Sequence, residues 1–199
     1  MDLFFNMPPS HPAKHSLRAE CLAIRERITP DVAKAASLEV AKQLVTIIPV
    51  SAGIIAGYRA VRGEIDSFEA MAQLSERGHK LCLPVIIAPR APLVFRRWRI
   101  GHPLEMGQYG IEIPPASEPE LIPDAVIVPL VAFDAKGNRL GYGAGFYDAT
   151  IHQLRALKKH VQIIGVAFAA QQVEHIPAES HDAKLDAVVT EKGIINDDR

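Results

Sequence analysis

Short apolar runs alternate with helical patterns along this chain. Runs of this kind at residues 53–58, 80–86, 125–133, 161–168 and 185–190 predict strands. The run at 125–133 is apolar on both alternations, which is typical of a strand covered on both faces of a sheet. Strands alternating with helices predict a single α/β domain, with a mostly parallel central sheet and helices on both faces.

The first predicted helix begins near Pro12 and combines an apolar stripe with basic residues. Lys14 and Arg18 are one turn apart and can reach the same object, whereas Arg25 lies further along. The simpler alternative for these charges is a solvated basic face, which is common on surface helices. The residues predicted to be buried on this helix are Leu17, Cys21, Ile24 and Ile28.

Two further helices carry start signals. Thr29 is a predicted N-cap with Pro30 at the first helical position, and Asp66 with Glu69 resembles a capping box. Residues 93–98 resemble a half-exposed strand. The proline- and glycine-rich segment 101–123 is too long for an ordinary connection, so it is expected to be a functional loop packed over the sheet.

A glycine-rich loop follows the strand predicted at 125–133. A polar turn at 134–138 leads into residues 139–145, where glycine alternates with other residues, and a helical pattern begins at 146. Glycines let backbone N–H groups converge on an anion, and the next helix adds the positive end of its dipole. A phosphate site and a simple tight turn are about equally good interpretations. The spacing excludes a P-loop and a dinucleotide fingerprint.

Composition narrows the class of protein. The chain has 199 residues and a formal net charge of −1, which gives no reason to expect a nucleic-acid partner. Cys21 and Cys82 lie in apolar patterns and are predicted to be small buried hydrophobes. With an acid near the N-terminus and no apolar run approaching ~18 residues, we expect a cytoplasmic protein without a membrane contact. Residues 1–12 are predicted to be a flexible lead before a domain at 13–199.

Several motifs in one order resemble the 5-formyltetrahydrofolate cyclo-ligase family, also called methenyltetrahydrofolate synthetases. The likeness extends from Lys14 to Thr190, and the glycine loop is close to a family signature on its own. The motifs are Leu17-Arg18, Gly63-Glu64-Ile65-Asp66, Leu83-Pro84, Phe95-x-x-Trp98, Val128-Pro-Leu-Val-Ala-Phe-Asp134, Arg139-Leu-Gly-Tyr-Gly-Ala-Gly-Phe-Tyr-Asp148 and His181-Asp-x-x-Leu-Asp-Ala-Val-Val-Thr190.

The resemblance implies an enzyme dependent on ATP and Mg²⁺. Such an enzyme converts 5-formyltetrahydrofolate into 5,10-methenyltetrahydrofolate and releases ADP and phosphate. A formyl oxygen is a poor leaving group, so ATP phosphorylates it before N10 of the folate attacks the carbon. This chemistry needs positioning and charge neutralisation more than a covalent nucleophile. Its partners are expected to be the two small molecules alone, with the chain acting as a monomer.

The resemblance also implies roles for individual residues. Lys14 and Arg18 hold the ATP phosphates, Asp148 and Asp186 hold Mg²⁺, and Arg139 and Tyr147 serve catalysis. Tyr147 is equally consistent with a phosphate contact, a folate contact or helix packing. The ATP-wrapping loop consists of Arg139, Leu140, Gly141, Tyr142, Gly143, Ala144, Gly145, Phe146 and Tyr147. The expected folate residues are Tyr58, Arg59, Glu64, Trp98 and Tyr109, of which Trp98 is equally consistent with packing.

The chain departs from the family pattern at two places. Ala144 and Phe146 stand where many members have glycine and tyrosine, and Ala169-Ala170 replace an acid and a cysteine. A folate- or nucleotide-binding module that has lost turnover is therefore an alternative. An unrelated sugar-phosphate enzyme is a third hypothesis, but it leaves Glu64 and the basic first helix unexplained.

Overall fold

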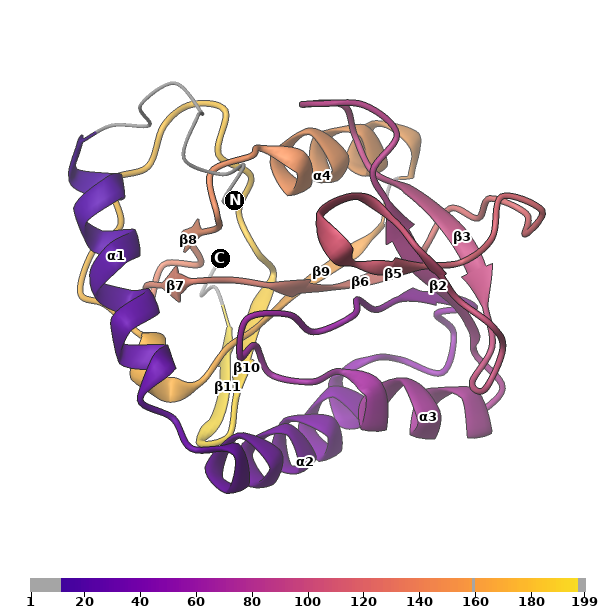
Figure 1. The fold of residues 1–199 in the computed structure, drawn as a ribbon, viewed down its shortest axis with the longest axis horizontal. Coiled ribbons are helices and arrows are strands. Elements are labelled where there is room, and N and C mark those ends of the chain that lie inside the picture. Colours follow the sequence, from indigo (N-terminus) through magenta and orange to yellow (C-terminus); the bar gives the residue numbers. More distant parts are fainter. Residues whose placement is uncertain (1–11, 159, 197–199) are drawn as a thin grey trace.

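A seven-stranded sheet forms the centre of the protein (Figure 1). The computed structural model describes residues 12–158 and 160–196. The five central strands run parallel in the order β10-β9-β6-β1-β2, and β11 and β3 flank them in antiparallel pairs. The strands are β1 Ile54–Ala56, β2 Lys80–Val85, β3 Val94–Trp98, β6 Ala125–Pro129, β9 Gln162–Val166, β10 Ala187–Thr190 and β11 Gly193–Asn196.

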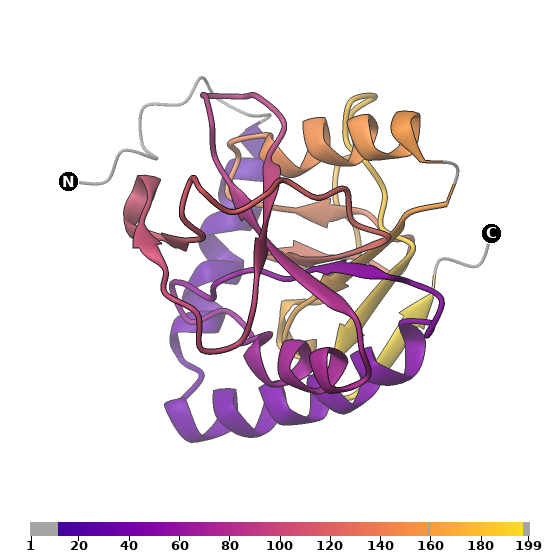
Figure 2. The same cartoon turned by 90° about the vertical axis from the view of Figure 1, so that its right-hand side faces the viewer.

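Helices cover both faces of the sheet, as the sequence predicts (Figures 1 and 2). On one face α2 (Pro30–Ile47) and α3 (Phe68–Glu76) pack against strand residues such as Ile55. On the other face α4 (Phe146–Leu157) packs against residues such as Val128. The two apolar clusters together bury both faces of the parallel strands. The prediction of a single α/β domain is confirmed.

The first helix, α1 (Pro12–Glu26), lies beside the sheet rather than on either face (Figure 1). It packs on the short hairpin of β7 (Ala132–Phe133) with β8 (Arg139–Leu140), and on the 3₁₀ turn η3 (Ala169–Gln171). The buried side chain of Cys21 makes this contact. The helix is therefore attached to the connections that follow the strands.

The predicted stripe of α1 was partly correct: Cys21 is buried, and Leu17 and Ile28 are partly buried against the core, but Ile24 is exposed. Ile24 is 40% exposed, whereas Lys14 and Arg25 are 4% and 3% exposed. The inward face meets polar groups, including the Leu130 carbonyl and the Tyr142 hydroxyl, in addition to the apolar contact of Cys21. A helix facing such partners buries cations that the hydrophobic pattern would place outside.

The single strand predicted at 125–133 was also wrong. Strand β6 ends at Pro129, and from Val131 the chain pairs with a different partner. The Val131 N–H donates to the Leu140 carbonyl at 2.7 Å, which opens the β7–β8 hairpin. The residues up to Phe133 are buried nonetheless, so the apolar pattern gave burial correctly and pairing incorrectly.

Local signals at the other helices were partly correct. Thr29 is the N-cap of α2, with Pro30 as its first residue. The N-cap of α3 is Ser67, so the predicted capping box was wrong, and the Asp66 carboxylate instead accepts from the Phe68 N–H at 2.9 Å. Both cysteines are buried. Most of the predicted lead, residues 1–11, lies outside the described residues.

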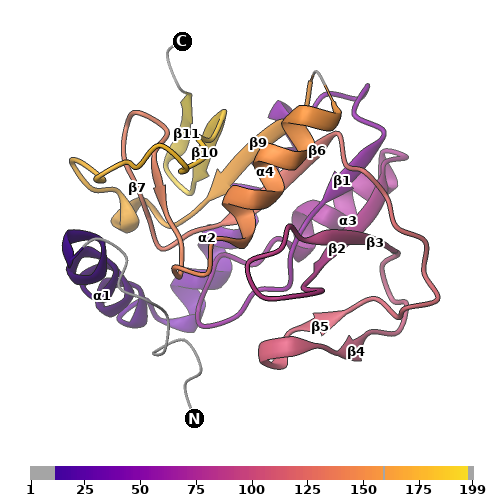
Figure 3. The ribbon, with the colours of Figure 1, turned by 90° about the horizontal axis from the view of Figure 1, so that it is seen from above.

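The segment 101–123 contains a small antiparallel unit. Strands β4 (Glu105–Met106) and β5 (Glu112–Ile113) pair around the 3₁₀ turn η2 (Gln108–Gly110). Figure 3 shows this unit on the opposite side of the sheet edge from α1. Within residues 12–158 and 160–196, no helix is long and apolar enough to cross a membrane.

Candidate active site

A cavity of about 350 Å³ opens where the parallel strands β1, β2 and β6 end. Ligands of open α/β sheets bind at these carboxyl ends, and the volume suits a small molecule. The cavity is lined by α1, the loop after β1, the end of β2 and the residues after it, the β4–β5 unit, the glycine loop and the segment 179–182. Helix α1 and the segment 179–182 lie far apart in the sequence, so the cavity forms only when the fold brings them together.

The glycine loop forms one wall and leads directly into α4. Gly143 and Gly145 have φ of 98° and 72°, in the left-handed region that favours glycine, and Gly145 is the N-cap of α4. Ala144 keeps a φ outside that region, so its methyl group causes no backbone strain. Backbone N–H groups at the start of α4 therefore lie at the cavity wall, where an anion would be stabilised.

Arg18 fixes this loop from the side of α1. Its Nε donates to the Gly141 carbonyl at 2.7 Å. Its guanidinium lies 3.4 Å from where a Cβ on Gly143 would stand. Burial lowers the pKa of the Arg18 guanidinium, but a group with so high a pKa stays charged. The loop thus carries a fixed positive charge beside its backbone N–H groups.

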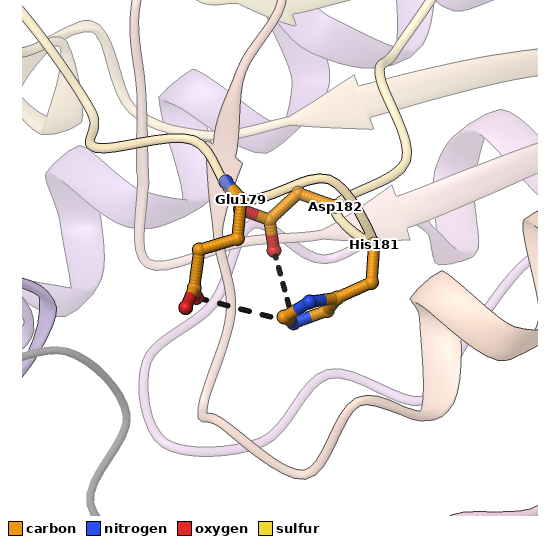
Figure 4. A group of neighbouring side chains, drawn as sticks. All are labelled: Glu179, His181 and Asp182. Atoms are coloured by element: carbon orange, nitrogen blue, oxygen red, sulfur yellow. Dashed lines mark hydrogen bonds and ion pairs between the residues drawn. The ribbon is translucent and has the colours of Figure 1, made fainter.

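Lys14, one turn earlier, is held between two acids. Its Nζ lies 2.6 Å from both Glu179 Oε2 and Asp182 Oδ2. Burial alone would lower the pKa of Lys14, but the two carboxylates raise it above its ordinary value. Figure 4 shows His181 beside the same acids, with its Nε2 at 3.9 and 3.8 Å from their oxygens. The ammonium occupies a position among oxygen ligands that could hold a cation.

Glu64 is the acidic residue with which the loop after β1 lines the cavity. The tight loop before it includes Arg62 and Gly63 in left-handed conformations, and the Val61 N–H donates to Glu64 Oε2 at 3.0 Å. Glu64 Oε1 accepts from the Tyr142 hydroxyl at 2.9 Å. Burial raises the pKa of the carboxyl group, and these two hydrogen bonds oppose that shift. Glu64 is 8% exposed and is fixed in place by both oxygens.

Arg139 and Asp148 form a buried pair where β8 and α4 meet the last loop. Arg139 Nη2 lies 2.6 Å from Asp148 Oδ1, which also accepts from the Ala183 N–H at 3.0 Å. Arg139 Nη1 donates to the Ala183 carbonyl. Burial lowers the pKa of Arg139, and Asp148 opposes that shift. Burial also raises the pKa of Tyr147, so this phenol is neutral at physiological pH.

The structure brings most of the predicted site residues to this one cavity. The loop after β1 supplies Tyr58, whose hydroxyl donates to the Ile65 carbonyl, and Arg59, whose Nη2 lies 2.6 Å from Glu112 Oε2 on the β4–β5 unit. The cavity is lined by the predicted residues Lys14, Arg18, Tyr58, Arg59, Glu64, Tyr109, Arg139, Leu140, Gly141, Tyr142, Gly143, Ala144, Gly145, Phe146, Tyr147 and Asp148.

Two predicted site residues, both of them described, lie outside the cavity. Trp98 is 5% exposed and packs near Phe68, with ring centroids 6.3 Å apart, as the packing alternative expects. Asp186 lies at the start of β10, where its oxygens accept from Arg155 Nη2 at 3.0 Å and from the Ile163 N–H at 2.8 Å. The sequence pattern placed both residues by order along the chain, which does not give the direction of a side chain.

Sequence reasoning missed several residues of the cavity. Arg25 does not line the cavity but contacts Tyr142, which does, and it had a usable signal, because it lies seven residues after Arg18 and so on the same side of the helix. For Glu179 and Asp182, the only signal was that several polar residues lie close together in the sequence. The other lining residues that were not predicted are Val61, Arg62, Pro84, Ile86, Leu93, Gln108, Ile111, Ile113, Pro129 and His181.

The fold and the cavity define a class of protein: a small α/β protein with a glycine-rich loop and a buried acid in one cavity at the ends of its parallel strands. A sequence model described as the 5-formyltetrahydrofolate cyclo-ligase family matches residues 10–191. Because this match spans most of the chain, the chain belongs to the 5-formyltetrahydrofolate cyclo-ligase family.

Known proteins similar to this chain agree with that assignment. A 5-formyltetrahydrofolate cyclo-ligase of Escherichia coli (strain K12) is 34% identical over 172 residues, covering 83% of this chain and 93% of the relative. One from Mycolicibacterium smegmatis is 32% identical over 195 residues, covering 92% and 96%. These relatives support a 5-formyltetrahydrofolate cyclo-ligase activity for the family member described here.

Solved structures show the same fold. The 5,10-methenyltetrahydrofolate synthetase of Aquifex aeolicus superimposes with a TM-score of 0.73 at 26% identity, covering 94% of this chain and 93% of that one. The enzyme of the same name from Mycoplasma pneumoniae gives a TM-score of 0.72 at 20% identity, covering 89% and 98%. The second likeness concerns the fold alone.

Proposed function

We propose that this chain converts 5-formyltetrahydrofolate into 5,10-methenyltetrahydrofolate with ATP and Mg²⁺, releasing ADP and phosphate. The observation that carries the proposal is the cavity itself, in which the basic face of α1 and the glycine loop stand opposite Glu64. One wall suits a triphosphate and the other suits the N–H donors of a pterin ring. The two substrates can therefore meet in a single space at the ends of β1 and β6.

The nucleotide end relies on fixed positive charge. Arg18 and the N–H groups of the loop and of α4 bind phosphate oxygens, and Lys14 exchanges its two carboxylates for phosphate. Arg139, which lines the cavity, offsets the negative charge of the terminal phosphoryl group while this group is transferred to the formyl oxygen. The oxygen then leaves as phosphate once N10 has formed its bond to the carbon.

Carboxylates at the same end could hold a magnesium ion in place of the cations Arg139 and Lys14, with which they pair in this structure. Asp148 and Asp182 both line the cavity, and Ala183, adjacent to Asp182, is bonded to Asp148. Carboxylate oxygens are the ligands that Mg²⁺ prefers, and the bound ion would neutralise charge on the phosphates. We therefore place Asp182 in the ligand set instead of Asp186, which lies beyond the cavity.

The folate end is built from Glu64 and neutral aromatic surface. Ionised Glu64 accepts from the pterin, while Tyr58 and Tyr147 supply apolar ring surface within the same wall. Arg59 and Tyr109 lie toward the β4–β5 unit, where Arg59 can exchange Glu112 for a substrate carboxylate. Tyr147 has its hydroxyl neutral, so it acts as a donor rather than as a base.

An absorbance assay tests the proposal directly. Purified protein is mixed with 5-formyltetrahydrofolate, ATP and Mg²⁺, and formation of the methenyl product is followed together with ADP release. Product is expected only when all three are present. The variant Asp148→Ala should lose most turnover at limiting Mg²⁺, a larger effect than the loss of stability that follows from leaving buried Arg139 without its acid. A folded wild-type protein that makes no methenyl product would refute the function.

A binding module without turnover is the competing hypothesis, motivated by Ala144 and Phe146. The relaxed φ of Ala144 argues against it, because the loop keeps its two left-handed glycines where they are needed. Phe146 lines the cavity. It lacks the hydroxyl of a tyrosine, but none of the proposed steps needs a hydroxyl at this position. Tight folate binding with no ADP release would favour the binding module.

A further inference from the structure

Arg25 is a buried cation on α1 that the proposed reaction does not yet use. It is 3% exposed and contacts Tyr142 of the glycine loop. Its Nη2 donates to the Tyr142 hydroxyl at 2.5 Å, its Nη1 donates to the Leu130 carbonyl at 3.5 Å, and its guanidinium carbon lies 5.6 Å from the Tyr142 ring centroid. A charge buried this deeply is costly unless its partners are fixed.

The chemistry of the groups determines the direction of this chain of hydrogen bonds. A guanidinium can only donate, so the Tyr142 oxygen must accept from Arg25. The single hydroxyl proton of Tyr142 is then directed to Glu64 Oε1, 2.9 Å away. Glu64 accepts at Oε1 from Tyr142 and at Oε2 from the Val61 N–H. These hydrogen bonds therefore match the ionised form of Glu64 and leave other lone pairs of its carboxylate for a ligand.

The charged and titratable groups around Glu64 favour the same form. Arg25 of α1 and Arg62 of the same loop are both near enough to lower the pKa of Glu64, although burial raises it overall. The guanidinium of Arg62 also lies over the Tyr142 ring, at 5.3 Å from the centroid. Tyr58 and Tyr147 face the carboxylate as neutral phenols. Tyr142 is thus held between the two guanidinium groups and the acid.

We propose that Arg25 is a positioning residue that acts through the Tyr142 hydroxyl to hold Glu64 ionised and correctly aimed. The inference rests on the proposed function and extends it. Tyr142 belongs to the glycine loop, whereas Glu64 belongs to the folate end, so the same hydroxyl joins the two ends of the cavity.

The substitution Tyr142→Phe tests the chain by removing a single oxygen. A lost hydrogen bond to a charged group costs about 1.5–3 kcal/mol, so the KM for the folate should rise by roughly tenfold or more. The KM for ATP should change by less than about twofold. The acid limb of kcat/KM for the folate should move to higher pH, because Glu64 has lost a donor that favours its ionised form.

A double-mutant cycle with Arg25→Met separates a relay from two independent contacts. If Arg25 acts through Tyr142, the double variant should lose no more folate affinity than the worse single variant. Arg25→Lys, which keeps the charge but cannot reach both partners, should recover only part of the loss. The control Arg27→Met removes an exposed arginine two residues further on and should leave both KM values unchanged.

Three results would overturn the inference: an unchanged folate KM in Tyr142→Phe, equal rises in both KM values without a change in the pH profile, or additive losses in the cycle. If Arg25→Met does not fold, Tyr142→Phe and Arg25→Lys decide the same question. A wild-type protein without product would refute the proposed function instead. Direct binding of 5-formyltetrahydrofolate, with and without a non-hydrolysable ATP analogue, would then test the relay separately.

Discussion

The first two helices adjoin in sequence but bury opposite kinds of residue. Helix α2 buries small and aliphatic side chains, including Val40 and Leu44, against the sheet. Helix α1 buries Lys14 and Arg25 together with one cysteine. Both helices begin with proline and have similar lengths, so local sequence signals do not separate them. The chemistry of the inward face does: α2 faces the core, whereas α1 faces a cavity.

This contrast has an energetic basis. Apolar burial is non-directional and contributes roughly 25 cal/mol per Å² along the whole of α2. The cations of α1 gain only if each meets its own partner, as Lys14 meets Glu179 and Asp182 and Arg25 meets Tyr142. Changes in α2 should therefore alter stability, and changes in α1 should alter function.

The largest effect is expected from Leu44→Ala in α2. Leu44 is fully buried, and truncating such a leucine costs about 2–5 kcal/mol in the free energy of unfolding. Denaturant titration measures this loss, and kcat/KM below the unfolding transition should stay within about twofold of wild type. Leu38→Ala, at a 44% exposed position on the same helix, is the matched control. Equal losses in the two variants would contradict the assignment of α2 to the core.

Lys14→Met should lower activity strongly and stability little, which is the reverse of Leu44→Ala. If Lys14 binds phosphate as proposed, its loss should lower kcat/KM for ATP by about a hundredfold, equivalent to roughly 2.7 kcal/mol of transition-state stabilisation. Unfolding should change far less than in Leu44→Ala, since its acidic partners can turn to water. Steady-state kinetics and urea unfolding measure the two quantities. Lys34→Met makes the same change at an exposed position of α2 and should be silent in both.

Acid should loosen α1 before α2. The hydrogen bond from Lys14 lowers the pKa of Glu179, so this contact is fully present above the ordinary glutamate pKa of about 4.3. It is lost as pH falls through the lower folded value. Amide exchange protection factors should therefore drop in α1 in that window while those of α2 hold. Simultaneous loss in both helices would mean that Lys14 does not secure α1.

The smallest effect is expected from Ile24→Ser on α1. The hydrophobic pattern makes Ile24 a core residue, but it is 40% exposed. Its replacement should change the free energy of unfolding by less than about 0.5 kcal/mol, as at other surface positions. Urea unfolding decides the matter. A loss as large as that of Leu44→Ala would restore the apolar stripe of α1 and refute the polar inward face.

The order of elements could be predicted because it depends on local patterns. Strands β1, β2 and β9 and helix α2 follow from apolar runs and the Thr29-Pro30 signal alone. Burial along 125–133 was equally clear. The bend after Pro129 was not, because it depends on pairing with Leu140, which local periodicity does not report.

Site residues were predictable where a motif fixed them and not where tertiary contacts did. Glu64 and the glycine loop came from contiguous motifs and line the cavity. Asp186 and Asp182 lie four residues apart in an irregular segment, and only the path of the chain shows that Asp182 turns inward. Arg25 was misplaced because a burial rule based on hydrophobicity treats every arginine as exposed.

The contact between Lys14 and its two acids also sets a schedule for folding. Lys14 lies 165 residues before Glu179 and 168 residues before Asp182. These contacts cannot form until the ribosome has synthesised the chain as far as Asp182. The parallel strands β1, β2 and β6 can assemble from nascent chain much earlier. A nascent chain would thus carry part of the parallel sheet before the cavity is complete, and the proposed ability to bind ATP would arise late in its synthesis.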